Sequence, residues 1–562
     1  MSHRMKRQFC SQAGIMLAGA VCTFAAMSGA RAGTIDVGNP DVEVRWDNTF
    51  KYTLGQRVGH QSGKVMGYTS GRRGEEDGDL SFQQGDLITS RMDLLTELDV
   101  SFRKSMGMRV SAAAWYDPIY QGRNNNDGTG NNNNLGYASD KFPKGTADLH
   151  GKQAELLDAF VYKTFELPKE QSLSVRLGRY TLLYGESLFF GANGIAGAQT
   201  PIDIVKALSL PGAQFKEIGV PVTQTSFQYQ ISPRLSFGGY YQLEWRPNRV
   251  PSAGSYFSAN DSVGPGGHYV FLPPGGGLPA NSYLHRVKDI EPSNLGQGGL
   301  QIRFKPAENW DFGLYYSRFH AKDFVNYVRP GVNGSGATTY GQDLGEYALA
   351  YPEGISLYGA SFATNIGDTN VSGETSIRTN QPLASPGGAV ADTGGRAGIG
   401  PNRLYPVGKT FHANLSAITL FNETRIWNAA NLVAEVAYNR RLEVTNRKAL
   451  DPNVTVDAVG LRGTFTPEYY QVTPGLDLTL PITIGYNPWG RSSLGPTVFG
   501  GGDSGDITIA LQGVWENTWK AGLQFTHYFG PAGSLHDRNS NYSFDQVYAD
   551  RDYVAFNVQR TF

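Results

Sequence analysis

The sequence predicts an all-β protein that forms a single transmembrane antiparallel β-barrel of about 18 strands. Three observations favour this fold class. Long segments alternate apolar with polar side chains, and long and short gaps between these segments alternate along the chain. An export signal also precedes a chain with no later apolar run long enough for a transmembrane helix. Outer-membrane barrels combine these features, because their short turns lie on one side of the membrane and their long loops on the other.

The clearest strands indicate which side chains face lipid and which face the lumen. In residues 42–54, Val42, Val44 and Trp46 share one face, and charged residues occupy the other. Residues 87–103 and 234–246 alternate in the same way. A solvent-facing sheet could look alike, but these runs exceed the about 5–6 residues of a typical globular strand. The inward faces predict the following lumen-wall residues: Arg91, Asp93, Glu97, Asp99, Arg103, Gln242 and Glu244.

The gaps between strands give the stronger topological signal. The predicted strands are 42–54, 87–103, 107–117, 153–166, 171–180, 222–231, 234–246, 297–305, 310–321, 355–366, 370–379, 410–421, 430–440, 463–472, 475–486, 505–516, 518–529 and 551–562. Every odd gap is long and every even gap is a short turn, as expected for outer loops and periplasmic turns. We therefore expect residues 33–562 to form one barrel domain. A count of 16 remains open, because the boundaries between 410 and 486 are the least distinct.

The N-terminus carries the signs of a secretory signal peptide. Arg4, Lys6 and Arg7 precede an apolar stretch, and Ala30-Arg31-Ala32 fits an A-x-A cleavage site. We expect residues 1–32 to be removed after Ala32, and with them both cysteines, Cys10 and Cys22. The formal net charge of −1 gives no support for nucleic-acid binding. The expected location is the outer membrane of a Gram-negative bacterium.

The C-terminal segment "DYVAFNVQRTF" is predicted to close the barrel. Val554, Phe556, Val558 and Phe562 share one face, and small or polar residues share the other. The last strand of a closed barrel pairs with the first. The apolar alternation that ends on Phe562 also resembles the C-terminal signal read by the barrel-assembly machinery, which is therefore an expected partner together with outer-membrane lipid.

One long gap, residues 181–221, differs from the others because it is neither Asn-rich nor especially polar. Thr200, Pro201 and Asp203 suit the first turn of a short helix, as in a capping box, and Pro211-Gly212 would stop it. An apolar loop of this length should not extend into water. We expect it to fold into the lumen as a plug or constriction, and the alternative is an outer cap packed on neighbouring loops.

The same segment supplies the candidate functional residues. Its apolar side chains would meet the apolar part of a transported molecule, and its charged side chains would pair with the charged wall from strands such as 87–103. Glu186 and Ser187 would hydrogen-bond the loop to the wall. The predicted plug and substrate-path residues are Tyr184, Glu186, Ser187, Phe189, Phe190, Asp203, Lys206, Lys216 and Glu217.

Several stretches resemble a large proteobacterial outer-membrane family of unknown function. They include "GRYTLLYGESLFFGANGIAGAQTPIDIVKALSLPGAQFKEIGVPV", "GDLITSRMDLLTELDVSF" and "YPEGISLYGASFATNIGDTNVSGETS". Members of that family tend to be encoded beside a second uncharacterised periplasmic family and an exporter of the resistance-nodulation-division class. The resemblance implies transport of a hydrophobic or amphiphilic compound such as a lipid or sterol-like molecule. It also implies a periplasmic partner and an inner-membrane exporter as possible partners.

The sequence predicts neither an enzyme nor a cofactor or metal site. "GGDSGD" at 501–506 resembles a serine-protease nucleophile segment but lacks matching His and Asp context, and "GKT" at 408–410 is no P-loop. The leading hypothesis is a channel or transporter for a hydrophobic or amphiphilic molecule, gated by an internal loop. The alternatives are a general diffusion porin for small polar solutes and an outer-membrane hydrolase with a nucleophile near Ser187 or Ser504.

Overall fold

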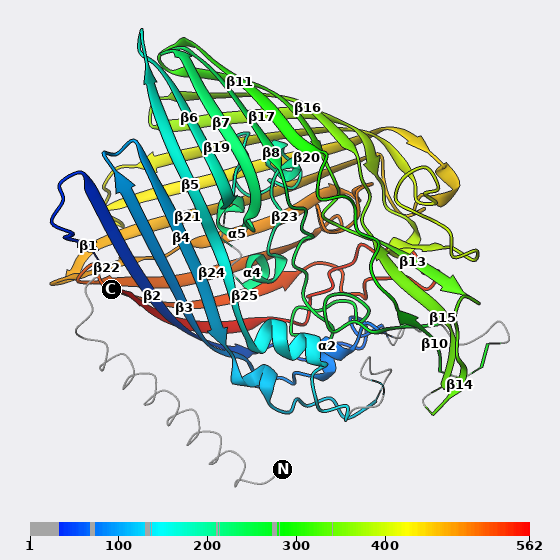
Figure 1. The fold of residues 1–562 in the computed structure, drawn as a ribbon. Helices are drawn as coiled ribbons and strands as arrows, with labels where there is room; N and C mark the ends of the chain where they lie inside the picture. Colours follow the sequence, from blue (N-terminus) through cyan, green and yellow to red (C-terminus); the bar gives the residue numbers. More distant parts are fainter. Residues whose placement is uncertain are drawn as a thin grey trace.

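The computed structural model describes residues 33–67, 74–129, 135, 138–209, 212, 214–272, 278–279, 281–339 and 341–562. The predicted signal peptide 1–32 and Pro211 lie outside these residues. The described part is a closed antiparallel β-barrel of 18 strands, with loops and short helices gathered at one end (Figure 1). Closure is made by the first and last strands, β2 and β26, which pair from Thr49 with Thr561 to Arg57 with Tyr553.

The barrel strands follow one another around the wall in chain order. They are β2 (Val42–Arg57), β3 (Leu87–Phe102), β4 (Met106–Tyr116), β5 (Lys152–Leu167), β6 (Gln171–Tyr180), β7 (Val222–Ser232), β8 (Leu235–Gln242), β11 (Gln297–Ala307), β12 (Trp310–Phe319), β16 (Ile355–Ile366), β17 (Thr369–Pro382), β19 (Val407–Phe421), β20 (Ala429–Thr445), β21 (Asp457–Thr473), β22 (Leu476–Thr479) with β23 (Ile482–Gly490), β24 (Ser504–Trp515), β25 (Trp519–Phe529) and β26 (Tyr553–Thr561). β22 and β23 form one strand interrupted at Leu480 and Pro481, because proline cannot donate a hydrogen bond to the ladder.

The predicted fold class and count of 18 strands are confirmed, since each predicted segment overlaps an observed strand. The largest difference in a strand's start is at β21, which begins at Asp457 rather than at 463. The other strands were not predicted: β1 (Gly33–Ile35), β9 (Tyr269–Phe271), β10 (Ser282–Arg286), β13 (Val325–Pro330), β14 (Gly336–Thr338), β15 (Gly341–Ala350) and β18 (Ala389–Ala391). β1 adds to β2, and the other six form a separate sheet from three loops.

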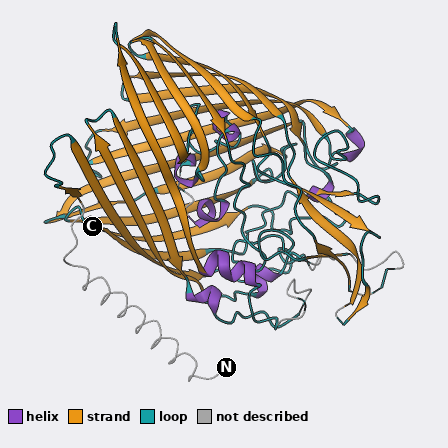
Figure 2. Cartoon of the chain, in the orientation of Figure 1, coloured by secondary structure: helices purple, strands orange, loops and turns teal. Residues whose placement is uncertain are grey.

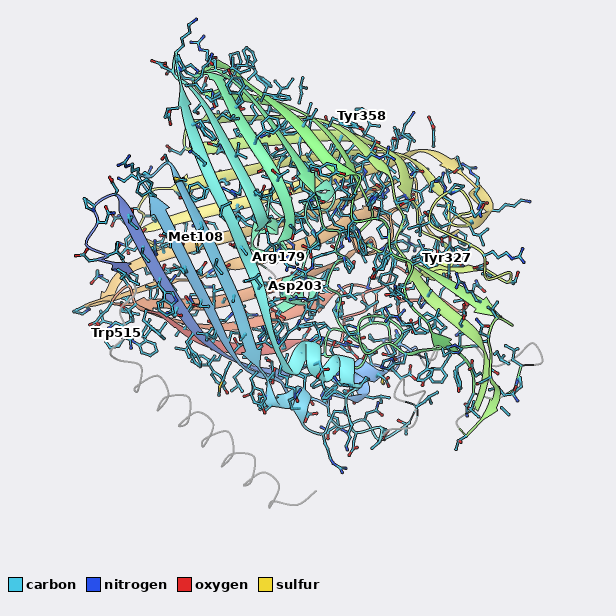
Figure 3. All side chains as sticks on the ribbon, in the orientation of Figure 1. Met108, Arg179, Asp203, Tyr327, Tyr358 and Trp515 are labelled. Atoms are coloured by element: carbon cyan, nitrogen blue, oxygen red, sulfur yellow. The ribbon has the colours of Figure 1, made fainter. Side chains whose placement is uncertain are left out.

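Side chains alternate across the barrel wall. Outward positions carry large apolar residues that stay half-exposed, such as Leu314 at 61%. Tyr358 at 55% and Trp515 at 49% are two further examples, and both are labelled in Figure 3. Inward positions of the barrel strands carry polar and charged residues, among them the buried Glu374 on β17 and Glu435 on β20. An apolar exterior around a polar interior is the arrangement that lipid outside and water inside require.

The helical elements all lie in the long loops (Figure 2). They are α2 (Asp77–Leu80), η1 (Pro118–Gln121), α3 (Lys144–Thr146), η2 (Ala147–Gly151), η3 (Ile195–Ala198), α4 (Ile204–Ser209), α5 (Phe215–Ile218), η4 (Pro386–Gly388) and η5 (Arg447–Ala449). No helix of the described residues is long and apolar enough to cross a membrane.

A buried ion cluster ties the first outer loop to the barrel rim. Asp79 on α2 binds Arg57 at 2.9 Å and Arg551 at 2.7 Å, and none of the three side chains is exposed. Arg551 also donates to the carbonyl oxygen of Ser258 in another long loop. These contacts fix three loops over one side of the outer opening.

Candidate functional site: a segment held inside the barrel

Residues 181–221 leave β6 at its outer end and turn into the barrel (Figure 1). At one wall, the side chain of Gln242 on β8 donates to the carbonyl oxygen of Gln199. At another, the hydroxyl of Tyr553 on β26 donates to the carbonyl oxygen of Leu208 at 3.3 Å. The segment therefore reaches across the lumen, and the predicted inward fold is confirmed.

The carboxylate of Glu435 on β20 binds a tight turn of the segment. It accepts hydrogen bonds from the main-chain N–H groups of Leu188, Phe189 and Phe190 and from the hydroxyl of Ser187 at 2.8 Å. Each bond to an ionised acceptor contributes about 1.5–3 kcal/mol. Glu435 thus satisfies donors of the turn that have no partner in a helix or sheet.

A second wall carboxylate, Glu374 on β17, binds the two ends of the loop 186–195, which contains this turn. It accepts from the main-chain N–H of Glu186 at 2.6 Å and from that of Ile195 at 2.7 Å. Gly185 and Gly194 border these contacts, and a Cβ at either position would collide with the carboxylate. Glycine is needed here for close approach, and at Gly185 also for a φ of +91°.

Arg378 lies four residues after Glu374 on the same face of β17 and binds carbonyl oxygens of the loop. Its Nη2 donates to the carbonyl oxygens of Ala192, Asn193 and Gly194 at 2.8–3.0 Å. The side chain of Asn193 in turn donates to Asn414 on β19 at 2.8 Å. The wall from β17 to β20 therefore binds both N–H and C=O groups of residues 186–195.

Five of the predicted plug residues lie at or beside the contact between residues 186–195 and the barrel wall. Tyr184 packs against Tyr240 and Tyr315 at ring-centroid distances of 5.5 and 6.1 Å. Glu186 pairs with Arg303 on β11 at 2.9 Å. Ser187 and Phe189 bind Glu435, and Phe190 packs on the ring of Phe499.

The predicted pairing of the segment's charges with strands such as 87–103 is wrong. Asp203 pairs with Arg249 at 2.7 Å, and Arg249 also binds Glu155 on β5. Lys206 donates to the carbonyl oxygen of Glu217 at 2.6 Å, while the carboxylate of Glu217 accepts from the main-chain N–H of Gln214. Lys216 is exposed on α5. These charges stabilise the segment itself or join it to a loop.

The predicted helix also differs in its first turn. The helix α4 begins at Ile204, and Asp203 caps it by accepting from the main-chain N–H of Lys206 at 2.9 Å. Thr200 instead donates to the carbonyl oxygen of Val220, which ties the two arms of the segment together. A second helix, α5, has a capping box formed by Gln214 and Glu217 and was not predicted.

Most of the predicted wall residues of β3 lie on its inward face and form ion pairs, either along β3 or with an arginine of β4. Arg91 pairs with Asp93 at 2.6 Å. Arg109 on β4 binds Glu97, Asp99 and Asp158 together. No described contact joins these residues to the segment 181–221.

The remaining predicted wall residues lie at strand ends. Arg103 is misplaced by the prediction, because it lies beyond β3 in the turn to β4 and pairs with Asp41. Gln242 lies buried at the end of β8 and bonds to the segment. Glu244, just beyond β8, accepts from the N–H and hydroxyl of Thr223 at the start of β7.

The two serines considered as nucleophiles make structural hydrogen bonds. Ser187 donates to Glu435, and Ser504 donates to the carbonyl oxygen of Gly501. In the described residues, no histidine is hydrogen-bonded to either hydroxyl. Within the same part of the chain, no group of three or more His, Cys, Asp or Glu side chains is arranged to hold a metal ion.

The chain matches one family model and several solved barrels. The model of a family described as "Protein of unknown function (DUF1302)" matches residues 13–562. No curated protein matches the chain. The structure is similar to Acinetobacter baumannii OccAB4, at 9% identity with 93% of this chain and 100% of that chain covered and a TM-score of 0.40. It is also similar to Pseudomonas aeruginosa OccK9 (OpdG), at 10% identity, 92% and 98% coverage and a TM-score of 0.39, and to the outer membrane channel DcaP of Acinetobacter baumannii, at 9% identity, 95% and 100% coverage and a TM-score of 0.39.

Proposed function

The chain belongs to this family of unknown function, and we propose that it is an outer-membrane channel gated by residues 181–221. Its cargo is a hydrophobic or amphiphilic small molecule of a lipid-like or sterol-like class. The protein resides in the outer membrane of a Gram-negative bacterium after cleavage near Ala32. It is assembled there by the barrel-assembly machinery and works with a periplasmic partner and an inner-membrane exporter.

The observation that carries the proposal is the capture of the segment's main chain by Glu374, Arg378 and Glu435. All three side chains belong to barrel strands, and all three are at most 5% exposed. The segment can detach from these three side chains while the barrel remains closed, because none of the bonds belongs to the strand ladder. This is the property that a gate requires.

The apolar character of the segment favours an amphiphilic cargo over small polar solutes. Ala196, Phe215 and Ile218 form a buried apolar cluster. Leu183, Phe189 and Ile202 are only half-buried, so the segment also presents apolar surface. A diffusion porin for polar solutes gains nothing from apolar surface in its aqueous path. An amphiphile gains favourable burial there, at about 25 cal/mol per Å² of apolar surface.

Deletion of residues 187–215 tests the proposal. Loss of the segment is expected to raise single-channel conductance in planar bilayers several-fold and to sensitise cells to bulky antibiotics, because the lumen loses the structure that crosses it. Heat-modifiable migration on gels confirms that the barrel has assembled. An assembled deletion variant with unchanged conductance and unchanged antibiotic sensitivity would refute the gate.

A further inference from the structure

A cavity of about 120 Å³ lies against the outer side of the segment 181–221. Ala192, Thr200 and Phe215 form its floor, and residues that follow the outer ends of β12 and β17 form its walls. Its volume suits an ionised head group and the few carbons next to it, since a cavity of about 150 Å³ can hold a benzene molecule.

Two cations face this cavity. Lys322, in the loop after β12, is 8% exposed, and Arg378 on β17 is 5% exposed. The ammonium of Lys322 donates to the carbonyl oxygens of Gly197 and Ala198 at 3.4 and 3.2 Å, which are long bonds for a charged donor. Two like charges in one largely buried space repel each other and lose hydration, so an anion between them offsets both costs.

Donors and acceptors around the cavity also remain unused. The three hydrogen bonds of Arg378 use only Nη2, and its Nε has no partner among the described residues. In the same described part, Gln381 Oε1 and Ser385 Oγ likewise have none. Both side chains line the cavity and are at most 9% exposed. Buried polar groups are normally paired, so three unpaired groups around one cavity indicate a polar ligand.

Apart from the polar side chains of Thr200, Asn248 and Tyr542, much of the remaining lining is apolar. It is formed by side chains from the segment, from the outer loops and from the start of β16, and includes Ile202, Phe319, Phe324, Ile355, Leu383 and Val498. The one acid there, Asp323, is exposed and accepts from Asn248 at 2.8 Å. The cavity thus combines a cationic centre with an apolar surround.

We propose that this cavity binds the anionic head group of a small amphiphile, with Lys322 and Arg378 holding the charge and the apolar lining holding the first part of its carbon chain. The proposal deepens the channel function, on which it rests for the role of the cavity as an entry site at the gate. Because Arg378 also binds the carbonyl oxygens of residues 192–194, an anion beside its guanidinium competes for the group that docks the segment.

The electrostatics of Lys322 make this binding depend on pH. Burial, and then the charge of Arg378, lower the pKa of Lys322 to about 7, while Asp323 opposes that shift. The other titratable groups near Lys322 are Asp323, Arg378 and Tyr542 in the lining and His320 in the same loop. Desolvation raises the pKa values of Asp323 and Tyr542 and lowers that of His320. Lys322 is therefore cationic below about pH 7 and neutral above it, and an anion is bound more tightly on the acidic side.

The test measures binding of octanoate, octan-1-ol and acetate to the full barrel in detergent by calorimetry. We expect octanoate to bind at least about tenfold more tightly than octan-1-ol or acetate at pH 6. Its affinity should fall about tenfold between pH 6 and pH 9, because Lys322 loses its charge in that range. Lys322→Met should abolish the preference, and Lys322→Arg should keep it but remove the pH dependence. Lys448→Gln, at an exposed lysine of η5, is the matched control and should behave as wild type.

Equal binding of octanoate and octan-1-ol in wild type, or unchanged octanoate binding in Lys322→Met, would overturn the anion site. Such a result leaves the gate intact if the 187–215 deletion still raises conductance. Conversely, charge-selective octanoate binding together with unchanged conductance of that deletion variant supports the anion site and refutes the gate.

Discussion

The two sides of the lumen wall use their charged residues in opposite ways. On β17–β20, Glu374 and Glu435 direct their carboxylates at main-chain N–H groups of the segment 181–221 and are at most 4% exposed. On β3–β5, Arg109 binds Glu97 and Asp99 beside it, and the side chain of Arg109 is 31% exposed. One wall is a docking surface, and the other is a self-paired ion network.

This difference shows that an inward-facing charge in a barrel wall can either bind an internal segment or pair with a neighbouring charge of the wall. A buried charge without an ion partner on its own wall is costly unless another group supplies hydrogen bonds. Glu374 and Glu435 therefore require the segment, whereas the network around Arg109 is balanced without it. We infer that the free part of the lumen lies toward β3–β5.

The largest effect is expected from Glu374→Ala combined with Glu435→Ala. The double variant leaves five main-chain N–H groups of the segment without their carboxyl acceptors, at about 1–3 kcal/mol for each buried donor left unsatisfied. The docked state should then no longer dominate, and single-channel conductance should rise several-fold in planar bilayers. Glu97→Ala is the matched control, because it removes a lumen carboxylate that does not touch the segment. An equal increase in both variants would mean that the docking wall has no special role.

A smaller effect of a different kind is expected from Arg109→Met. The carboxylates of Glu97, Asp99 and Asp158 lose the cation that they share, so the free lumen becomes more negative. The reversal potential across a KCl gradient should shift toward cation selectivity, with little change in conductance. Arg425→Met, in the exposed turn between β19 and β20, should leave the reversal potential unchanged. A conductance increase without a change in selectivity would place the segment against β3–β5 instead.

The barrel could be predicted from the sequence because its signal is local. Period-2 alternation over a whole strand, as in residues 42–54, fixes both the strand and its outward face. The six-stranded sheet of the outer loops could not be predicted in this way. Its strands β9, β14 and β18 have only three residues each, and β13 pairs with β18 across about sixty residues of chain.

The docking site was predicted in part, for a similar physical reason. Gly185, Glu186 and Ser187 could be identified from the segment itself, but their partners Glu374 and Glu435 lie on distant strands. A signal was present in the sequence: both acids stand among small or apolar residues, in "VSGETS" and "LVAEVA", unlike the acids of 87–103 that alternate with one another. An isolated inward acid flanked by small residues indicates room for another main chain to approach.

The smallest effect should come from Lys206→Met combined with Lys216→Met, because neither lysine is described in contact with the β17–β20 wall or the β3–β5 wall. Lys206 donates to the carbonyl oxygen of Glu217 within the segment, and both lysines are exposed. Exposed positions of this kind usually change stability by less than about 0.5 kcal/mol, which is too little to undock a segment held by two carboxylates. Asp203→Ala should have an intermediate effect, since it removes both the cap of α4 and the ion pair with Arg249. For the lysine variant, conductance and the thermal midpoint should match wild type. If the two lysine substitutions instead open the channel as widely as the loss of Glu374 and Glu435, the segment is held by its own charges, and the β17–β20 wall does not bind it.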